Sequence, residues 1–70
     1  MNIGDLVMFT NSSSRYAKWF LGKIGEVQTS TYGSDGKLHC RVKWLLPVKY
    51  FDRYAHVSDF KAKDFEVYSA

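Results

Sequence analysis

The sequence lacks the cysteine pairs that often stabilise a small protein, and it lacks the long apolar segments that hold a protein in a membrane. Its 70 residues include one cysteine, Cys40, so no disulfide can form within the chain. An unpaired thiol suits a reducing compartment, and we therefore expect a cytoplasmic protein. The N-terminus lacks a basic region followed by an apolar stretch, which argues against a signal peptide. Apolar runs such as residues 44–46 are far too short to cross a bilayer, so no membrane contact is expected.

Long runs of one charge are also missing. Ten basic residues are interleaved with seven acidic ones, and the net charge is +3 with a pI near 9.1. This mild excess of positive charge is compatible with a polyanionic partner, but the chain carries no basic arm of the kind that binds nucleic acid. No repeat, low-complexity tract or linker interrupts the sequence, so residues 1–70 are expected to form one domain.

Aromatic residues, in contrast, are plentiful. Phe, Trp and Tyr make up 17% of the chain. A chain this short buries only about 60% of the surface that its unfolded form exposes, so each core side chain matters. Because each ring buries a large area, we expect rings to supply much of a core that no disulfide supports.

The first third of the chain predicts a strand followed by a long loop. In residues 5–10, Val7 and Phe9 fall on one face, which indicates a strand with one apolar side. Residues 11–14 end this strand with side chains that compete for backbone hydrogen bonds. Residues 15–21 are aromatic but have no clear period, and we expect them to form a long ordered loop.

Two glycines mark the start of the second strand. Gly22 and Gly25 permit a bulge or a positive φ angle there, which would let the strand coil sharply. On this interpretation Ile24 and Val27 face the core on either side of the bulge. Residues 32–37 contain an Asp-Gly pair and predict a hairpin turn after the strand.

The third strand has the clearest pattern in the chain. Its apolar residues alternate with basic ones: Leu38, Cys40, Val42 and Trp44 against Lys37, His39, Arg41 and Lys43. Pro47 is expected to end the strand, because proline cannot donate to a ladder. Residues 49–54 then form a second aromatic and charged connection.

The C-terminal residues predict two further strands. Residues 55–57 indicate a short fourth strand, and residues 58–60 a single turn of 3₁₀ type. Residues 64–68 close the sheet as the last strand. The side chains expected to point inward from it are those of Phe65 and Val67. A helix over residues 57–65 is the competing prediction.

This pattern of elements resembles the Src-homology-3-like barrel. Five short strands, a long first loop and a one-turn helix before the last strand imply a small all-β fold of that class. Within it, Gly-Asp-Leu-Val at residues 4–7 and Gly-Lys-Ile-Gly-Glu-Val at residues 22–27 resemble the KOW-type subset. KOW domains typically bind RNA, ribosomes or transcription complexes, so the resemblance implies a nucleic-acid or nucleoprotein partner.

Other barrels of this class show weaker resemblances. Tudor and Agenet domains are similar in the Gly-Asp-x-Val opening and in a tryptophan within the first loop, which implies an aromatic cage for methylated side chains. Photosynthetic accessory barrels are similar in length and opening, which implies docking of acidic electron carriers through basic residues. The overall character is also similar to small uncharacterised phage proteins.

The rings of the two connections are the best candidates for a binding site. In an SH3-like fold these connections converge at one end, where rings can stack on bases, hold a peptide or surround a cation. The candidate residues are Tyr16, Trp19, Phe20, Tyr50 and Tyr54, with Phe51 beside them. The alternative, which stays open, is that Trp19 and Phe20 cover a core too small to close on aliphatic side chains.

The basic residues supply further candidates for binding, whereas the possible reactive groups do not form a site. Lys23, Arg41 and Lys43 are candidates for binding phosphates or an acidic protein, although an ordinary solvated strand face is the favoured explanation for the basic residues of the third strand. His39 and Cys40 are neighbours on a strand and point to opposite faces, so we expect no metal site. No nucleophile or carboxylate pair has a partnered base, and we expect neither an enzyme nor a cofactor.

Three functions remain open on the sequence. The first is a non-enzymatic binding module that contacts a larger protein or nucleoprotein assembly through an aromatic and basic loop surface. The second is direct binding of RNA or DNA in the manner of KOW domains. The third is a structural barrel that buries its surplus rings in a homodimer.

Overall fold

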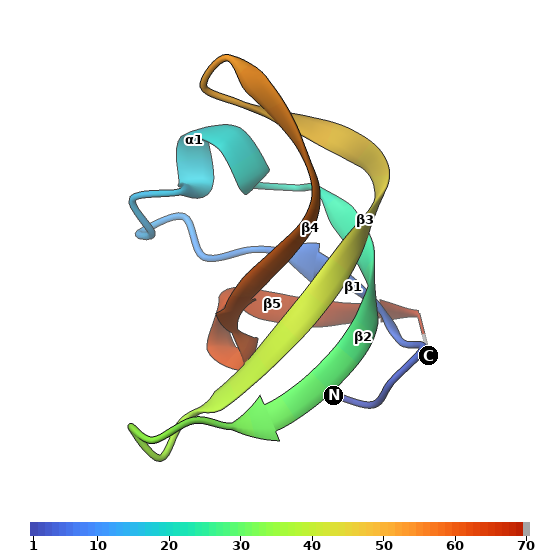
Figure 1. The fold of residues 1–70 in the computed structure, drawn as a ribbon, viewed down its shortest axis with the longest axis vertical. Helices are drawn as coiled ribbons and strands as arrows, with labels where there is room; N and C mark the ends of the chain where they lie inside the picture. The colour runs from blue at the N-terminus through green and yellow to red at the C-terminus, as the bar shows by residue number, and fades with distance from the viewer. Residues whose placement is uncertain (70) are drawn as a thin grey trace.

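The computed structural model describes residues 1–69 and contains five antiparallel strands in one sheet (Figure 1). The strands are β1 (Leu6–Phe9), β2 (Ile24–Tyr32), β3 (Leu38–Tyr50), β4 (Arg53–Lys61) and β5 (Phe65–Ser69). They are joined by one helical turn, α1 (Ala17–Phe20), and one 3₁₀ turn, η1 (Ala62–Asp64). The strand order β4-β3-β2-β1-β5 places β4 and β5 at the two edges. The expected all-β fold is confirmed, with a long first connection and a 3₁₀ turn before the last strand.

The core lies on the inner side of this bent sheet. It consists of nine buried residues: Val7, Phe9, Phe20, Val27, Cys40, Val42, Trp44, Val48 and Phe65. Phe9 lies among other rings, with its centroid 5.1 Å from that of Phe60 and 5.4 Å from that of Phe65, both in edge contacts. Such edge contacts add to the free energy of burial. The expectation that aromatic rings build much of the core is therefore confirmed.

The alternation expected for the third strand is also present. Cys40, Val42 and Trp44 are buried, while Arg41 and Lys43 are exposed. Together with Val48, these buried side chains make β3 the source of four of the nine buried core residues.

Pro47 does not end β3, contrary to the sequence-based expectation. The strand continues to Tyr50, and its pairing with β4 is interrupted between Lys43 and Val48. Pro47 lies inside this interruption, where no ladder bond needs its missing N–H group, and proline is tolerated at such irregularities.

The glycines before and within β2 were expected to permit a bulge or a positive φ angle, and Gly22 does have a φ of 81°. The bulge itself lies elsewhere. The pairing of β2 with β3 shifts between Val27 and Thr29, after the glycines rather than beside them. Gly25 is buried and faces the core with Val27, whereas Ile24 is half-buried and pairs with Met8. Strand alternation explains this result, because residues 25 and 27 share a face and residue 24 takes the other.

The second connection is a tight hairpin rather than a loop over residues 49–54. Tyr50 pairs with Arg53, so only Phe51 and Asp52 form the turn. β3 and β4 therefore extend as a long two-stranded arm, whose tip lies beside α1 in Figure 1.

The fourth strand is longer than expected and displaces the 3₁₀ turn. β4 has nine residues, whereas the sequence predicted a strand over residues 55–57 and a turn over 58–60. Ser58 and Asp59 instead belong to the ladder with β3, where the Trp44 indole N–H donates to the Ser58 hydroxyl at 2.9 Å. The turn falls at residues 62–64, and the competing helix over 57–65 is absent from the described residues.

Two smaller expectations were also wrong. Residues 15–21 are not entirely loop, since α1 forms one helical turn among them. Val67 is 53% exposed rather than directed into the core, although Phe65 on the same strand is buried. Within residues 1–69, β5 is an edge strand that pairs with β1 alone, so fewer neighbouring residues cover its C-terminal end.

Candidate binding surface

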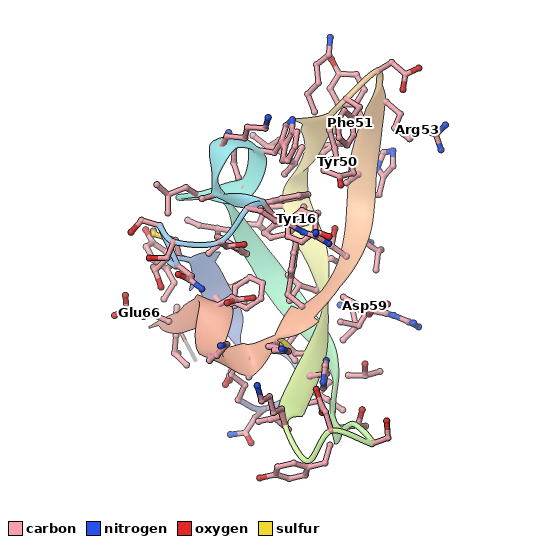
Figure 2. The ribbon with its side chains drawn as sticks, turned by 90° about the vertical axis from the view of Figure 1, so that its left-hand side faces the viewer. Tyr16, Tyr50, Phe51, Arg53, Asp59 and Glu66 are labelled. Carbon is pink, nitrogen blue, oxygen red and sulfur yellow. The ribbon has the colours of Figure 1, made fainter. Side chains whose placement is uncertain are left out.

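Four aromatic side chains from two distant parts of the chain meet near the tip of the β3–β4 arm. Tyr16 and Trp19 come from the first connection, and Tyr50 and Phe51 from the arm. We call these four residues the aromatic cluster. The ring centroids of Trp19 and Tyr50 are 4.8 Å apart, those of Trp19 and Phe51 4.8 Å, and those of Tyr50 and Phe51 4.6 Å. The ring centroid of Tyr16 is 6.3 Å from that of Tyr50, and Tyr16 extends the cluster toward the middle of the molecule (Figure 2).

Phe51 is held in an unfavourable backbone conformation. Its φ angle is 57°, which bulky side chains rarely adopt, and 64% of the residue is exposed. Glycine or asparagine would fit this turn position at lower cost. Strained residues of this kind concentrate at functional sites. An exposed phenylalanine here therefore points to a use for its ring that the stability of the turn does not require.

Two of the candidate rings lie outside the cluster's exposed surface. Phe20 is 3% exposed and belongs to the core, with its ring stacked 5.2 Å from that of Trp44. Tyr54 is exposed but pairs with Lys49, and successive residues of a strand point to opposite faces. It therefore lies on the face away from Tyr50. The sequence left open whether Trp19 and Phe20 bind a ligand or cover the core. In the structure Phe20 is a core residue, whereas Trp19 is only partly buried.

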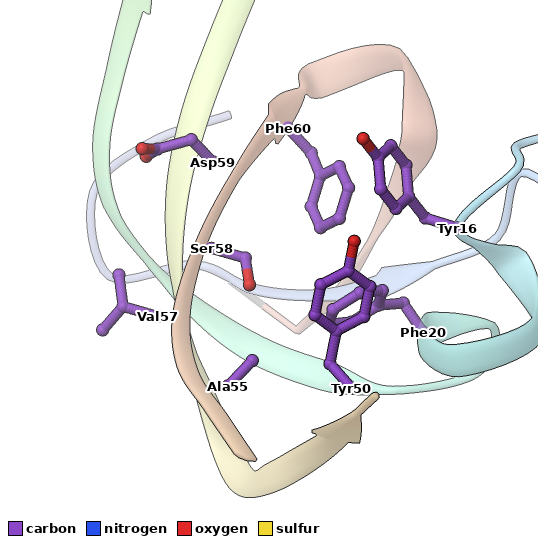
Figure 3. Close-up of a pocket in the computed structure, with 8 residues that line it drawn as sticks. All are labelled: Tyr16, Phe20, Tyr50, Ala55, Val57, Ser58, Asp59 and Phe60. Carbon is purple, nitrogen blue, oxygen red and sulfur yellow. The ribbon is translucent and has the colours of Figure 1, made fainter. Parts of the chain in front are cut away.

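A groove runs between the first connection and β4. Its cavity of about 440 Å³ is lined by Tyr16, Phe20, Tyr50, Ala55, Val57, Ser58, Asp59 and Phe60. Figure 3 shows the side chains of Tyr16, Tyr50 and Phe60 gathered on one side of β4, while those of Val57 and Asp59 point away on the other. Residues from both faces of β4 line this cavity because the groove follows the edge of that strand.

A second hollow of about 330 Å³ adjoins the groove and shares Tyr16 and Tyr50 with it. Its other lining residues are Arg15, Lys18, Trp19 and Phe51. The aromatic cluster therefore borders two connected depressions rather than one closed pocket.

Two cations lie against the rings. The Lys18 ammonium is 4.3 Å from the centroid of a Trp19 ring, and the Arg15 guanidinium carbon is 5.1 Å from that of Tyr16. Arg15 also donates to the Tyr16 hydroxyl at 3.0 Å. Cation–π contacts of this kind use the ring faces that a bound methylated cation would need. The surface consequently favours an anionic or apolar ligand over a cationic one.

The basic candidates are not brought to the aromatic cluster. Arg41 and Lys43 lie on the outer face of β3, opposite the buried Val42 and Trp44. Arg41 forms a two-point contact with the Asp59 carboxylate at 2.9 and 3.3 Å, which raises the pKa of the guanidinium. A paired guanidinium is less available to a partner.

Lys23 lies elsewhere again. It borders a separate hollow with Gly22, Ile24 and the apolar segment at residues 45–47. The single aromatic and basic surface expected from the sequence is thus divided among different parts of the molecule.

The sequence did not identify two residues of this surface, Phe60 in the groove and Lys18 in the adjoining hollow. Phe60 was assigned to a turn, and Lys18 was not considered apart from the loop over residues 15–21. The adjacent Arg-Tyr and Lys-Trp pairs at residues 15–16 and 18–19 are the local signal that could have indicated ring-bound cations.

Reactive or metal-binding groups are not gathered at this surface. Cys40 is buried, and burial raises the pKa of its thiol, which keeps it in the unreactive protonated form. Among residues 1–69, no three His, Cys, Asp or Glu side chains are grouped in a way that could hold a metal ion. In the same part of the chain, no helix is long and apolar enough to span a membrane.

Comparison with known proteins adds no relative. No protein-family model matches the chain, and no match is found among curated proteins or solved structures.

Proposed function

We propose that this protein is a non-enzymatic binding module that acts in the cytoplasm and contacts a larger protein or nucleoprotein assembly through the aromatic cluster and its groove. The observation that carries the proposal is the strained, exposed Phe51, which completes a cluster of rings drawn from two separate elements. Tryptophan, tyrosine and arginine are the residues that most often dominate binding energy at protein interfaces. Trp19, Tyr16 and Arg15 supply all three types at this surface.

Site-specific photo-crosslinking tests the proposal. A photoreactive phenylalanine analogue would replace Phe51, and a second version of the protein would carry it in place of Tyr32, an exposed residue in the opposite hairpin. In extract of the cells that make the protein, we expect one defined species to be captured from position 51. It should be absent from position 32 and lost when Trp19→Ala is added. Equal capture from both positions, or none from position 51, would contradict the proposal.

A second candidate function is direct binding of single-stranded RNA or DNA. It is favoured by Lys18 and Arg15, whose charges lie beside rings on which bases could stack. The KOW-type resemblance of residues 4–7 and 22–27 supports the same candidate.

Titration of labelled oligonucleotides at low and physiological salt tests this candidate. Binding should quench Trp19 fluorescence and weaken steeply with salt, because phosphate contacts release counterions. Buried Trp44 should be unaffected, so the Trp19→Phe variant should bind without quenching. Binding that is insensitive to salt, or absent at low salt, would reject the nucleic-acid candidate.

A further inference from the structure

β4 is a long strand at one edge of the described sheet. Within residues 1–69 it pairs with β3 alone, over Arg53–Lys61. In an edge strand every second residue directs its N–H and C=O groups away from the sheet, where they can pair with another chain. At nine residues, β4 is longer than the usual strand of about five or six. None of its residues is proline, which would block such pairing.

This free edge forms one wall of the groove. Cavity-lining residues Val57 and Asp59 belong to the outer face of β4, and Ser58 and Phe60 to the inner face (Figure 3). A groove reached from both faces of a strand gives access to the backbone between them. Tyr16 stands on the opposite side, with its ring 5.5 Å from that of Phe60. An extended segment in the groove would thus meet backbone groups on one side and aromatic rings on the other.

The charges around this edge are mainly positive, because four lining cations face one carboxylate, Asp64, that has no ion-pair partner in the described part of the chain. The lining acids are Asp59, which is paired with Arg41, and Asp64, which is buried and accepts from the Asn11 amide at 2.8 Å. The lining cations of the connected hollows are Arg15, Lys18, Lys61 and Lys63. His39, which also borders the hollow beside Lys61, is held by Asp35 at 3.1 Å. Acidic side chains on a bound segment would therefore find complementary charge at both ends of the groove.

We propose that the partner docks as an extended acidic peptide strand, which pairs with the free edge of β4 over residues 57–61 and rests alternate apolar side chains on Tyr16 and Phe60. The inference rests on the proposed function and specifies the chemistry of the partner. Main-chain hydrogen bonds provide affinity in this mode of recognition, and the sites for alternate side chains provide specificity. Nucleic acid lacks the alternating amide groups that such pairing needs.

Selection from a random peptide library displayed on phage tests the proposal with the unmodified protein. We expect enriched peptides to carry acidic residues and apolar residues at alternate positions. A fluorescent version of an enriched peptide should shift the backbone amide signals of residues 57–61 in NMR spectra. Tyr16→Ala should weaken binding by about tenfold. Tyr32→Ala, at an exposed ring far along the chain, should leave binding unchanged.

Backbone methylation of the peptide separates strand pairing from side-chain contact alone. N-methyl groups on one alternating set of residues should weaken binding by at least about tenfold, because they remove donors to the β4 edge. N-methyl groups on the other set should have little effect. This comparison does not depend on the stability of any protein variant.

Several results would overturn the inference while leaving the proposed function standing. Equal effects of the two methylation patterns, or amide shifts confined to α1 and the arm tip, would show that the rings bind without strand pairing. Failure to enrich any peptide would also reject it, even if position 51 still captured a species from extract. Salt-sensitive oligonucleotide binding that shifts the same amides would assign the groove to nucleic acid instead.

Discussion

At the residue scale, Gly25 lies where β3 leaves no room for a side chain on the core face of β2. A Cβ atom at this position would overlap the Val42 Cγ1 atom and lie 2.8 Å from the carbonyl oxygen of Lys43. Gly25→Ala should therefore lower the free energy of unfolding by about 1–3 kcal/mol through overpacking. Urea denaturation followed by tryptophan fluorescence measures the change.

Gly33→Ala is the matched control for this prediction. The closest atoms to a Cβ there belong to the side chains of His39 and Asp35, at 2.9 and 3.0 Å, and side chains can move aside. A cost at Gly33 equal to that at Gly25 would show that lost glycine flexibility, rather than the contact with β3, sets the effect.

The Asp35 carboxylate in the β2–β3 hairpin should make the stability of the protein depend on pH. The backbone N–H of Lys37 donates to its carboxylate at 2.9 Å, and this bond, with a smaller contribution from His39, lowers the pKa below the ordinary 3.8. A carboxyl whose pKa is depressed by folding stabilises the fold above its unfolded pKa. That stabilisation is lost as the pH falls through the folded pKa. Asp35→Ala should thus be less stable than the parent at neutral pH and nearly equal to it below the folded pKa.

Chemical denaturation at neutral and acidic pH checks this expectation. Asp52→Ala in the other hairpin serves as the control, because its contact with Arg53 is exposed and 3.8 Å long. A difference between Asp35→Ala and the parent that persists unchanged at acidic pH would rule out the carboxylate charge as its cause.

At the scale of the element, α1 carries two adjacent rings with different roles. Phe20 stabilises the core, and Trp19 belongs to the proposed binding surface. Phe20 contacts core rings, so Phe20→Ala should cost about 3–5 kcal/mol of stability. This is a large part of the roughly 4–10 kcal/mol expected for a domain of this size. Trp19→Ala removes a partly exposed ring and should cost only about 1–2 kcal/mol. Capture from position 51 should nevertheless be lost.

Unfolding curves of the two variants distinguish these roles. Fluorescence of Trp44 reports on the core in both proteins, since this side chain is itself buried there. Equal losses of stability would mean that Trp19 serves the core as Phe20 does, and the aromatic cluster would then lose its main functional candidate.

At the scale of the whole molecule, the binding proposal requires the aromatic cluster to be free in solution. We therefore expect sedimentation velocity to show a monomer whose mass does not change with concentration. A dimer that dissociates on dilution and disappears with Phe51→Asn would favour the structural homodimer. Asparagine tolerates the φ angle of 57° at this turn, so the substitution tests the ring without straining the backbone. A dimer unaffected by Phe51→Asn would instead involve another surface, such as the exposed Leu45 and Leu46.

Much of the fold followed from local patterns, and most errors arose where tertiary contacts override them. Alternation correctly separated the buried and exposed residues of β3, and the Asp-Gly pair identified the first hairpin, where Gly36 has a φ of 76°. Pro47 was misjudged because its effect depends on whether β4 pairs with it. Residues 58–60 look like a turn in isolation, but the Trp44 indole and the Arg41 guanidinium both bind side chains there across the ladder.

The candidate site was predicted in its residue types but not in its arrangement. Tyr16, Trp19 and Tyr50 were selected from the sequence, and the structure brings them together with Phe51. The basic residues expected beside them lie on the outer face of the sheet or at another hollow. Alternation already predicts opposite faces for Arg41 and Trp44, but it does not tell which face the first connection covers.

The sequence alone therefore determined the class of structure and the chemistry available to it: an all-β domain with surplus rings, a mild positive charge and a buried lone thiol. These properties depend on residue type and on local spacing, which the chain carries by itself. Only the tertiary structure decided which rings complete the core, which acids neutralise which cations, and which strand edge remains unpaired. Those outcomes depend on contacts between residues far apart in the sequence, where burial and charge pairing are set by what lies opposite.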